Sequence, residues 1–232
     1  MARQTPDVLF SVSTQDSVVA LTIDDGPHPT LTPRILDVLR ENDAHATFFI
    51  MGQHVAGNET LLRQMKEEGH ELGHHMWSAV PSVLLGRERF TRAFVRTDSL
   101  LRAYGVGPWF RPASGFTTGG MKEIAAVHGS RVALGDVYPN DAQQPFVPIL
   151  ADYILRNVRP GSVIILHDGL AWRVWTGHVL RRVLPRLRAR GYRIVTLSEL
   201  AAEETTLAER TRLEIRLAEV AAREVAVSRT TC

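Results

Sequence analysis

Between residues 18 and 200, short apolar runs rich in β-branched residues alternate with longer amphipathic stretches. The run Val18–Ile23 is typical of a strand buried on both faces, and it ends in the polar turn Asp24–Pro27. The pair Thr32-Pro33 resembles an N-cap and a first-turn proline, which predicts a helix directly after that turn. This alternation predicts a parallel sheet with helical crossovers, and a closed (β/α) barrel is one natural result.

Polar residues stand where most of the predicted strands end. Catalytic residues of parallel barrels lie at the carboxyl ends of the strands, so one domain with one active face is the simplest interpretation. Further strands are predicted at residues 46–51, 71–75, 109–112, 131–135, 163–167 and 193–197. The polar residues at strand ends are Asp24, Asp25, His74, His75, Arg111, Asp136, His167 and Asp168.

The composition is that of an ordinary globular protein, with 44% apolar and 22% charged residues in 232. Lys66 and Lys122 are the only lysines, so 25 of the 27 basic residues are arginines, and they are scattered among glutamates. No dense basic block suits a phosphate backbone, which argues against nucleic-acid binding.

No apolar run has the length of a membrane span, and Met1–Pro6 has no signal-peptide core. We therefore expect a cytoplasmic protein unless a secreted precursor was trimmed.

Nine histidines accompany a single cysteine, Cys232, so a metal site in this chain must use histidine and carboxylate ligands. Two adjacent carboxylates such as Asp24 and Asp25 can divide the work of hydrolysis, one binding a cation and the other accepting a proton. His75 would be a second metal ligand. The same Asp-Asp pair also suits a plain turn or helix cap.

Five segments resemble, in order, the motifs of the NodB-like polysaccharide deacetylases, carbohydrate esterase family 4. The resemblance implies a distorted (β/α) barrel that uses a divalent metal, commonly zinc, to remove N-acetyl groups from chitin-like or related polysaccharides or oligosaccharides. The matching segments are Thr22–Pro27, Glu71–Ser78, Phe110–Gly115, Asp136–Asp141 and Ile165–Gly169.

The resemblance also implies a domain organisation. Residues 18–200 would form the deacetylase domain, after an N-terminal segment of residues 1–17. Residues 201–232 are rich in Ala, Glu, Arg and Leu and would form a C-terminal helical tail. That tail suits a helix laid against the barrel or a dimerisation helix, so the oligomeric state stays open.

Proton-transfer roles follow from the same resemblance, position by position. Asp24 would be the general base, held by Arg111, which Asp141 would steady. His167 would be the general acid that protonates the leaving amine, and Asp168 would orient it.

Metal and substrate contacts are implied in the same way. Asp25 and His75 would bind the metal, and Leu166 would line the acetyl pocket. The backbone N–H of Ser114 would stabilise the tetrahedral oxyanion. Trp77 is a candidate for stacking on a sugar ring.

The chain departs from the family pattern at the third metal ligand, where the usual histidine is Ala79. Catalytic zinc normally has three protein ligands, so Asp25 and His75 alone would make a weakened site. His28 is the candidate replacement, and water is the other.

Two aromatic positions are lost as well, because the family's tyrosine and tryptophan are Ser114 and Ala142 here. We expect a metal-dependent deacetylase that acts on N-acetylated sugars. Because of Ala79, a catalytically impaired homologue that binds a sugar or a partner is an alternative interpretation. Because of the two lost aromatic residues, a hydrolase of a smaller amide is another.

Overall fold

The computed structural model describes residues 8–204, in which the strands form one curved sheet with every strand pair parallel. The strand order is β1-β6-β5-β4-β3-β2-β7, and β8 pairs with the first half of β2. The strands are β1 (Val8–Leu9), β2 (Val18–Asp24), β3 (Thr47–Ile50), β4 (Glu71–His74), β5 (Trp109–Phe110), β6 (Arg131–Ala133), β7 (Val163–His167) and β8 (Arg193–Val195).

Two isolated bridges close the sheet on itself in the described part of the chain: Val137 pairs with Ile164 of β7, and Ser11 pairs with Ser162. Val137 accepts a hydrogen bond from the N–H of Ile165 (3.0 Å) and donates one to the carbonyl of Val163 (3.2 Å). Isolated bridges, rather than a full strand pair, join the two edges of the sheet. The predicted distorted barrel is therefore confirmed.

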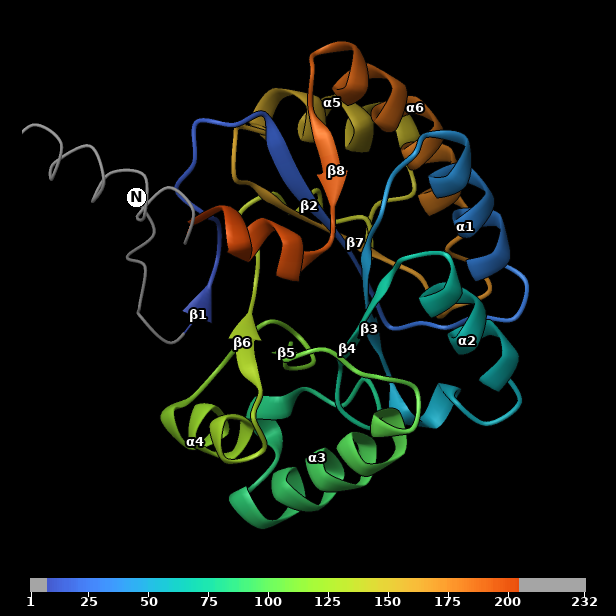
Figure 1. Ribbon diagram of the computed structural model, residues 1–232. Coiled ribbons are helices and arrows are strands. Elements are labelled where there is room, and N and C mark those ends of the chain that lie inside the picture. Colours follow the sequence, from blue (N-terminus) through green and yellow to red (C-terminus); the bar gives the residue numbers. More distant parts are fainter. Residues whose placement is uncertain (1–7, 205–232) are drawn as a thin grey trace, which may run out of the picture.

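Helices surround the outside of this sheet (Figure 1), as its crossover connections require. Most of them bury their apolar faces in a core against Leu21, Ile23 and Leu166. The two helices at residues 87–102 and 119–127 pack mainly in a second cluster, with Phe110 and Val132. The α-helices are α1 (Thr32–Glu41), α2 (Glu59–Glu67), α3 (Arg87–Arg102), α4 (Gly119–Val127), α5 (Val147–Asn157) and α6 (Trp175–Ala189), with short 3₁₀ turns η1 (Gly52–His54) and η2 (Ser82–Leu84).

The N-terminal boundary differs from the prediction, because the sheet begins before residue 18. Val8 and Leu9 pair with Val132 and Ala133, so part of the predicted N-terminal segment belongs to the barrel. A strand of two residues is too short to show an alternating pattern. At the other end, residues 197–204 are helical, and the rest of the predicted tail lies outside the described residues.

Strand β2 positions the functional site because it is paired along both of its edges. It pairs with β7 on one edge and with β3 and β8 on the other, and all seven of its residues are buried. Side chains alternate along a strand, so Leu21 and Ile23 face the helices while Thr22 and Asp24 face the barrel interior. Within residues 8–204, no helix has the length and apolar character needed to cross a membrane.

Candidate active site

A cavity of about 620 Å³ opens at the carboxyl ends of the strands. Five residues that the sequence marked as functional line it together: Asp24, Asp25, His75, Arg111 and His167. They come from the ends of β2, β4, β5 and β7, so parallel strand pairing brings them to one place.

Arg111 holds Asp24 in the interior of the barrel. Its Nη1 donates to Asp24 Oδ1 at 2.6 Å and to Thr22 Oγ1 at 2.7 Å, while its Nε donates to the carbonyl of Ala133 at 3.0 Å. Both charged side chains are almost completely buried. Burial lowers the pKa of Arg111, and the carboxylate of Asp24 opposes that shift. The ion pair orients a carboxylate whose second oxygen faces the cavity, as a general base requires.

His75 and Asp25 form the second pair. His75 Nδ1 lies 2.8 Å from the carbonyl of Arg111, so it carries the proton and donates. The other nitrogen, Nε2, then faces Asp25 Oδ1 at 3.2 Å and Asp24 Oδ2 at 4.0 Å. Two lone pairs at that distance repel each other unless a proton or a metal ion lies between them.

This pair matches two positions of a metal site. A tetrahedral zinc ion bonded at about 2.0–2.1 Å would hold two ligand atoms about 3.3 Å apart, close to the observed spacing. The third position remains Ala79, which lines the cavity without a donor atom. In the part of the chain that the structure describes, no three His, Cys, Asp or Glu side chains are arranged to hold a metal ion. The residues present therefore do not complete a three-ligand metal site.

The predicted replacement, His28, does not join Asp25 and His75. Its Nδ1 accepts the backbone N–H groups of Thr30 (3.2 Å) and Leu31 (3.3 Å) at the start of α1. The prediction is wrong because this nitrogen already accepts the N–H groups of the turn that leads into α1.

Arg173, which was not predicted from the sequence, places a positive charge next to the Asp25 carboxylate. Its Nη1 donates to Asp25 Oδ2 and, at 2.9 Å, to the carbonyl of Asp168. Burial alone raises the pKa of Asp25, but the hydrogen bond and charge of His75, the charge of His167 and the Arg173 guanidinium bring it well below its usual value. One oxygen of Asp25 is thus held by a cation, while the other faces His75.

His167 and Asp141 form the third pair across the cavity. His167 Nδ1 lies 2.8 Å from Asp141 Oδ1, and the backbone N–H of His167 donates to the other oxygen at 2.8 Å. Burial lowers the pKa of His167, but Asp141, Asp24 and Asp25 outweigh it and raise the pKa above its ordinary value. The raised pKa favours the protonated imidazole, which is the form that a general acid needs.

Two predicted supporting roles are wrong. Asp141 contacts His167 rather than steadying Arg111. Asp168 does not orient His167, because adjacent residues at a strand end point in opposite directions. Its Oδ2 instead accepts the hydroxyl of Thr32 at the start of α1, and its backbone N–H donates to the Asp24 carbonyl at 2.8 Å. Asp168 therefore fixes the end of β7 to α1 and β2.

The prediction of the acetyl-pocket residue is also wrong, because it names the neighbour of the residue that lines the cavity. Leu166 is fully buried in the core between sheet and helices, whereas Ile165 lines the cavity. Ile165 pairs with Thr22 and Leu166 with Ile23, so strand alternation places them on opposite faces of the sheet.

Ser114 lines the cavity and has a φ of 69°, in the left-handed region. Among the described residues its backbone N–H has no acceptor, and its hydroxyl donates to the carbonyl of Ala113 at 2.5 Å. Ala142 lines the cavity as well, so two lost aromatic positions leave open space there. Trp77 lies outside this cavity, in a neighbouring hollow.

The match to known proteins covers most of the chain. The family profile described as polysaccharide deacetylase matches residues 11–133. A peptidoglycan-N-acetylglucosamine deacetylase from Bacillus cereus is 33% identical over 196 residues, covering 83% of this chain and 92% of the relative. A chitooligosaccharide deacetylase from Sinorhizobium fredii is 33% identical over 204 residues, covering 78% and 90%.

Solved structures agree with these relatives. A family 4 acetyl xylan esterase from Clostridium thermocellum, in complex with a cobalt ion, superposes with a TM-score of 0.72 at 32% identity, over 79% of this chain and 89% of that one. A mutant of BA3943, a pseudoenzyme of the same family with restored enzymatic activity, superposes with a TM-score of 0.78 at 25% identity, over 86% and 72%.

The pair of His167 and Asp141 predicts the titration of the imidazole. Because the pKa is raised in the folded protein, protonation of His167 stabilises the fold below pH 6.5, and this contribution is lost as pH rises through the raised pKa. In Asp141→Asn, NMR titration of His167 should give a lower pKa than in the wild type. Asp152→Asn, which removes an exposed carboxylate, should leave it unchanged; an equal shift in both variants would contradict the pairing.

Removing Arg173 should destabilise the protein, because it leaves the Asp25 carboxylate buried with His75 as its remaining partner. Arg173→Met should lower the free energy of unfolding by about 3 kcal/mol, the low end for a broken buried pair, measured by urea denaturation. Arg156→Met breaks an exposed pair with Asp152 and should change little. The Asp25→Asn/Arg173→Met double variant should lose less than the sum of its single variants; strict additivity would show that the pair is not coupled.

Proposed function

Because this chain belongs to the polysaccharide deacetylase family, we propose that it hydrolyses N-acetyl groups on the sugars of an N-acetylated glycan. The supporting observation is the pairing of Asp24 with Arg111 and of His167 with Asp141 on two adjacent strands that face one cavity. A carboxylate fixed by a guanidinium and an imidazole whose protonated form is stabilised by a carboxylate are the two groups that amide hydrolysis needs.

In this proposal each group handles one proton. Asp24 accepts a proton from the water that attacks the acetyl carbonyl carbon, and Arg111 keeps the carboxylate oriented towards it. The negative charge that develops on the carbonyl oxygen is stabilised by the N–H of Ser114, which has no acceptor among the described residues. His167 then gives its proton to the sugar nitrogen as the C–N bond breaks, releasing acetate and a free amine.

Enzymes of this family depend on a metal. We propose zinc as the ion for this chain, since a carboxylate oxygen and an imidazole nitrogen are both donors that zinc accepts. Asp25 and His75 would hold it. With Ala79 in the third position, binding should be weak.

A catalytically impaired homologue that binds a glycan is the alternative. Ala79 and the ion pair between Arg173 and Asp25 favour it, and BA3943 shows that this fold includes a pseudoenzyme whose activity a mutant restores. In that case the wild type would release no acetate, and restoring the third ligand would create activity.

The proposed general acid is tested by acetate release from N-acetylglucosamine oligomers. His167→Ala should lower kcat/KM by about 10²–10⁴-fold, the usual contribution of a general acid, while the circular dichroism spectrum stays unchanged. His178→Ala, at an exposed histidine outside the active-site cavity, is the control and should keep full activity. Full turnover in His167→Ala would reject the assignment.

The third metal ligand is tested by direct metal binding, measured as zinc and cobalt affinity by isothermal titration calorimetry. Ala79→His should raise the affinity by at least about tenfold, since even a ligand's supporting residue contributes that much. Val80→His places the same group at the next residue, outside the active-site cavity, and should give no gain. An unchanged affinity in Ala79→His would show that position 79 does not face the metal.

A further inference from the structure

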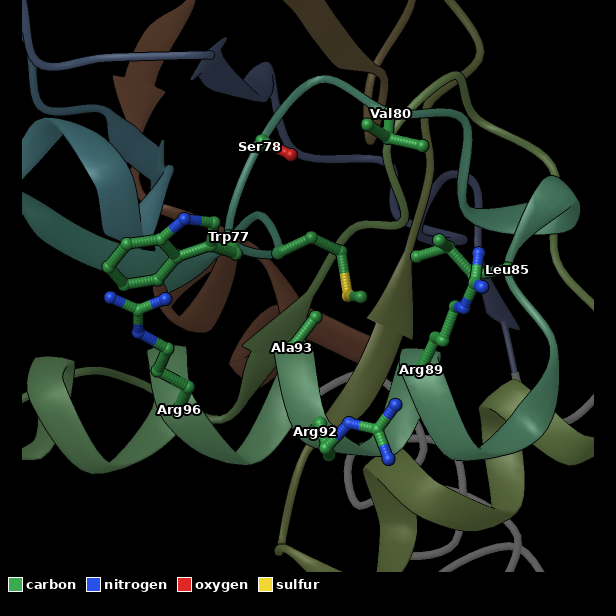
Figure 2. A pocket seen from close by; sticks show the side chains of 9 residues that line it. Trp77, Ser78, Val80, Leu85, Arg89, Arg92, Ala93 and Arg96 are labelled. Atoms are coloured by element: carbon green, nitrogen blue, oxygen red, sulfur yellow. The ribbon is translucent and has the colours of Figure 1, made fainter.

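A second hollow of about 390 Å³ lies between α3 and the segment that follows β4 (Figure 2). Its walls are apolar at Met76, Val80, Leu85 and Ala93. Three arginines of α3 line it, and we call the site the arginine groove: Arg89, Arg92 and Arg96.

The three arginines share one side of α3, because spacings of three and four residues return to the same face of a helix. Figure 2 shows them along the helix below the segment that carries Ser78 and Val80. Within residues 8–204, Arg89 and Arg96 have no acidic partner, and Arg92 pairs with the exposed Glu88 of its own helix. No acidic residue lines the groove.

Other arginines on the surface differ from those of the arginine groove in their acidic partners. Several of those are neutralised by an acidic side chain, as in the pairs Arg87–Glu123 and Arg181–Glu41. The arginine groove instead concentrates positive charge next to apolar walls, where an anion is attracted more strongly than on open surface.

Arg96 is held in place by an aromatic ring. Its guanidinium carbon lies 3.3 Å from the centroid of the Trp77 ring. Figure 2 shows the two side chains next to each other. The ring in turn packs against Gly52, where a Cβ atom would come within 2.7 Å of it. Stacking uses the flat face of the guanidinium and leaves its N–H edge available, which suits bidentate binding of a carboxylate.

The groove adjoins the active-site cavity through the chain segment between them. Ser78 and Val80 line the groove, while Ala79 between them lines the cavity that contains Asp24 and His167. A glycan with one sugar in the cavity can therefore reach the groove across this segment.

We propose that the arginine groove binds a carboxylate group carried by the glycan whose N-acetyl sugar occupies the active-site cavity. The proposal rests on the proposed function and sharpens it, because it selects acidic N-acetylated glycans over neutral ones. The substrate class is a glycan with lactyl, uronic or peptide carboxylates near the acetylated sugar. The apolar walls contact the carbon-bound hydrogens of the same group.

Calorimetric binding of two N-acetylated oligosaccharides of equal length, one neutral and one carrying carboxylates, tests this proposal. The wild type should bind the acidic oligosaccharide at least about tenfold more tightly, the effect of one charged hydrogen bond, and added salt should reduce the difference. Arg89→Gln/Arg96→Gln should abolish the preference. Arg96→Lys, which keeps the charge but loses the planar fork, should keep only part of it.

Arg87→Gln/Arg156→Gln removes the same charge elsewhere and should retain the preference. Equal affinity for both oligosaccharides, binding of neither, or equal loss in the control variant would overturn the proposal. Equally tight binding of a short single-stranded DNA would also overturn it, in favour of unspecific attraction of polyanions. Acetate release from the neutral oligosaccharide tests the proposed function separately, because the groove is not needed for it.

Discussion

The buried ion pair between Arg111 and Asp24 is the interaction on which the rest of the site depends. Arg111 follows β5, and its guanidinium donates to Thr22 and Asp24 of β2 and to the carbonyl groups of Ala133 and Leu134 at the end of β6. A guanidinium left unpaired in the interior would cost several kcal/mol, so all of these acceptors must be in place together. The same hydrogen bonds that tie the strands across the barrel therefore also set the position of the Asp24 carboxylate.

Around this centre, opposite charges are arranged in pairs that each hold one functional group. Arg173 holds one oxygen of Asp25, and Asp141 holds one nitrogen of His167. Such supporting partners fix the tautomer and orientation of the groups that act on substrate or metal. In the described part of the chain, Asp24 and His167 are thus each held by an opposite charge. Asp25 and His75 lie next to Arg173, without a third side chain placed to hold a metal ion.

The residues at strand ends were predictable because position relative to a strand is a local property. A buried apolar run followed by polar residues is visible in the sequence, and parallel pairing brings such ends together. Arg173 was not predictable, because it lies in a loop 148 residues from Asp25 and is one of many arginines. The partner of Asp141 and the exchange of Leu166 for Ile165 were missed because a motif match by itself does not state which face of a strand a residue occupies.

By itself, the sequence determined the barrel, the polar residues that gather at the ends of its strands, and the absence of a donor at Ala79. These depend on residue type and on spacing within single elements, which the chain carries locally. Only the tertiary structure decided which cation meets which carboxylate and that Arg96 stacks on Trp77. Such contacts join loops and elements that are distant along the chain, and their geometry exists only once the sheet has closed.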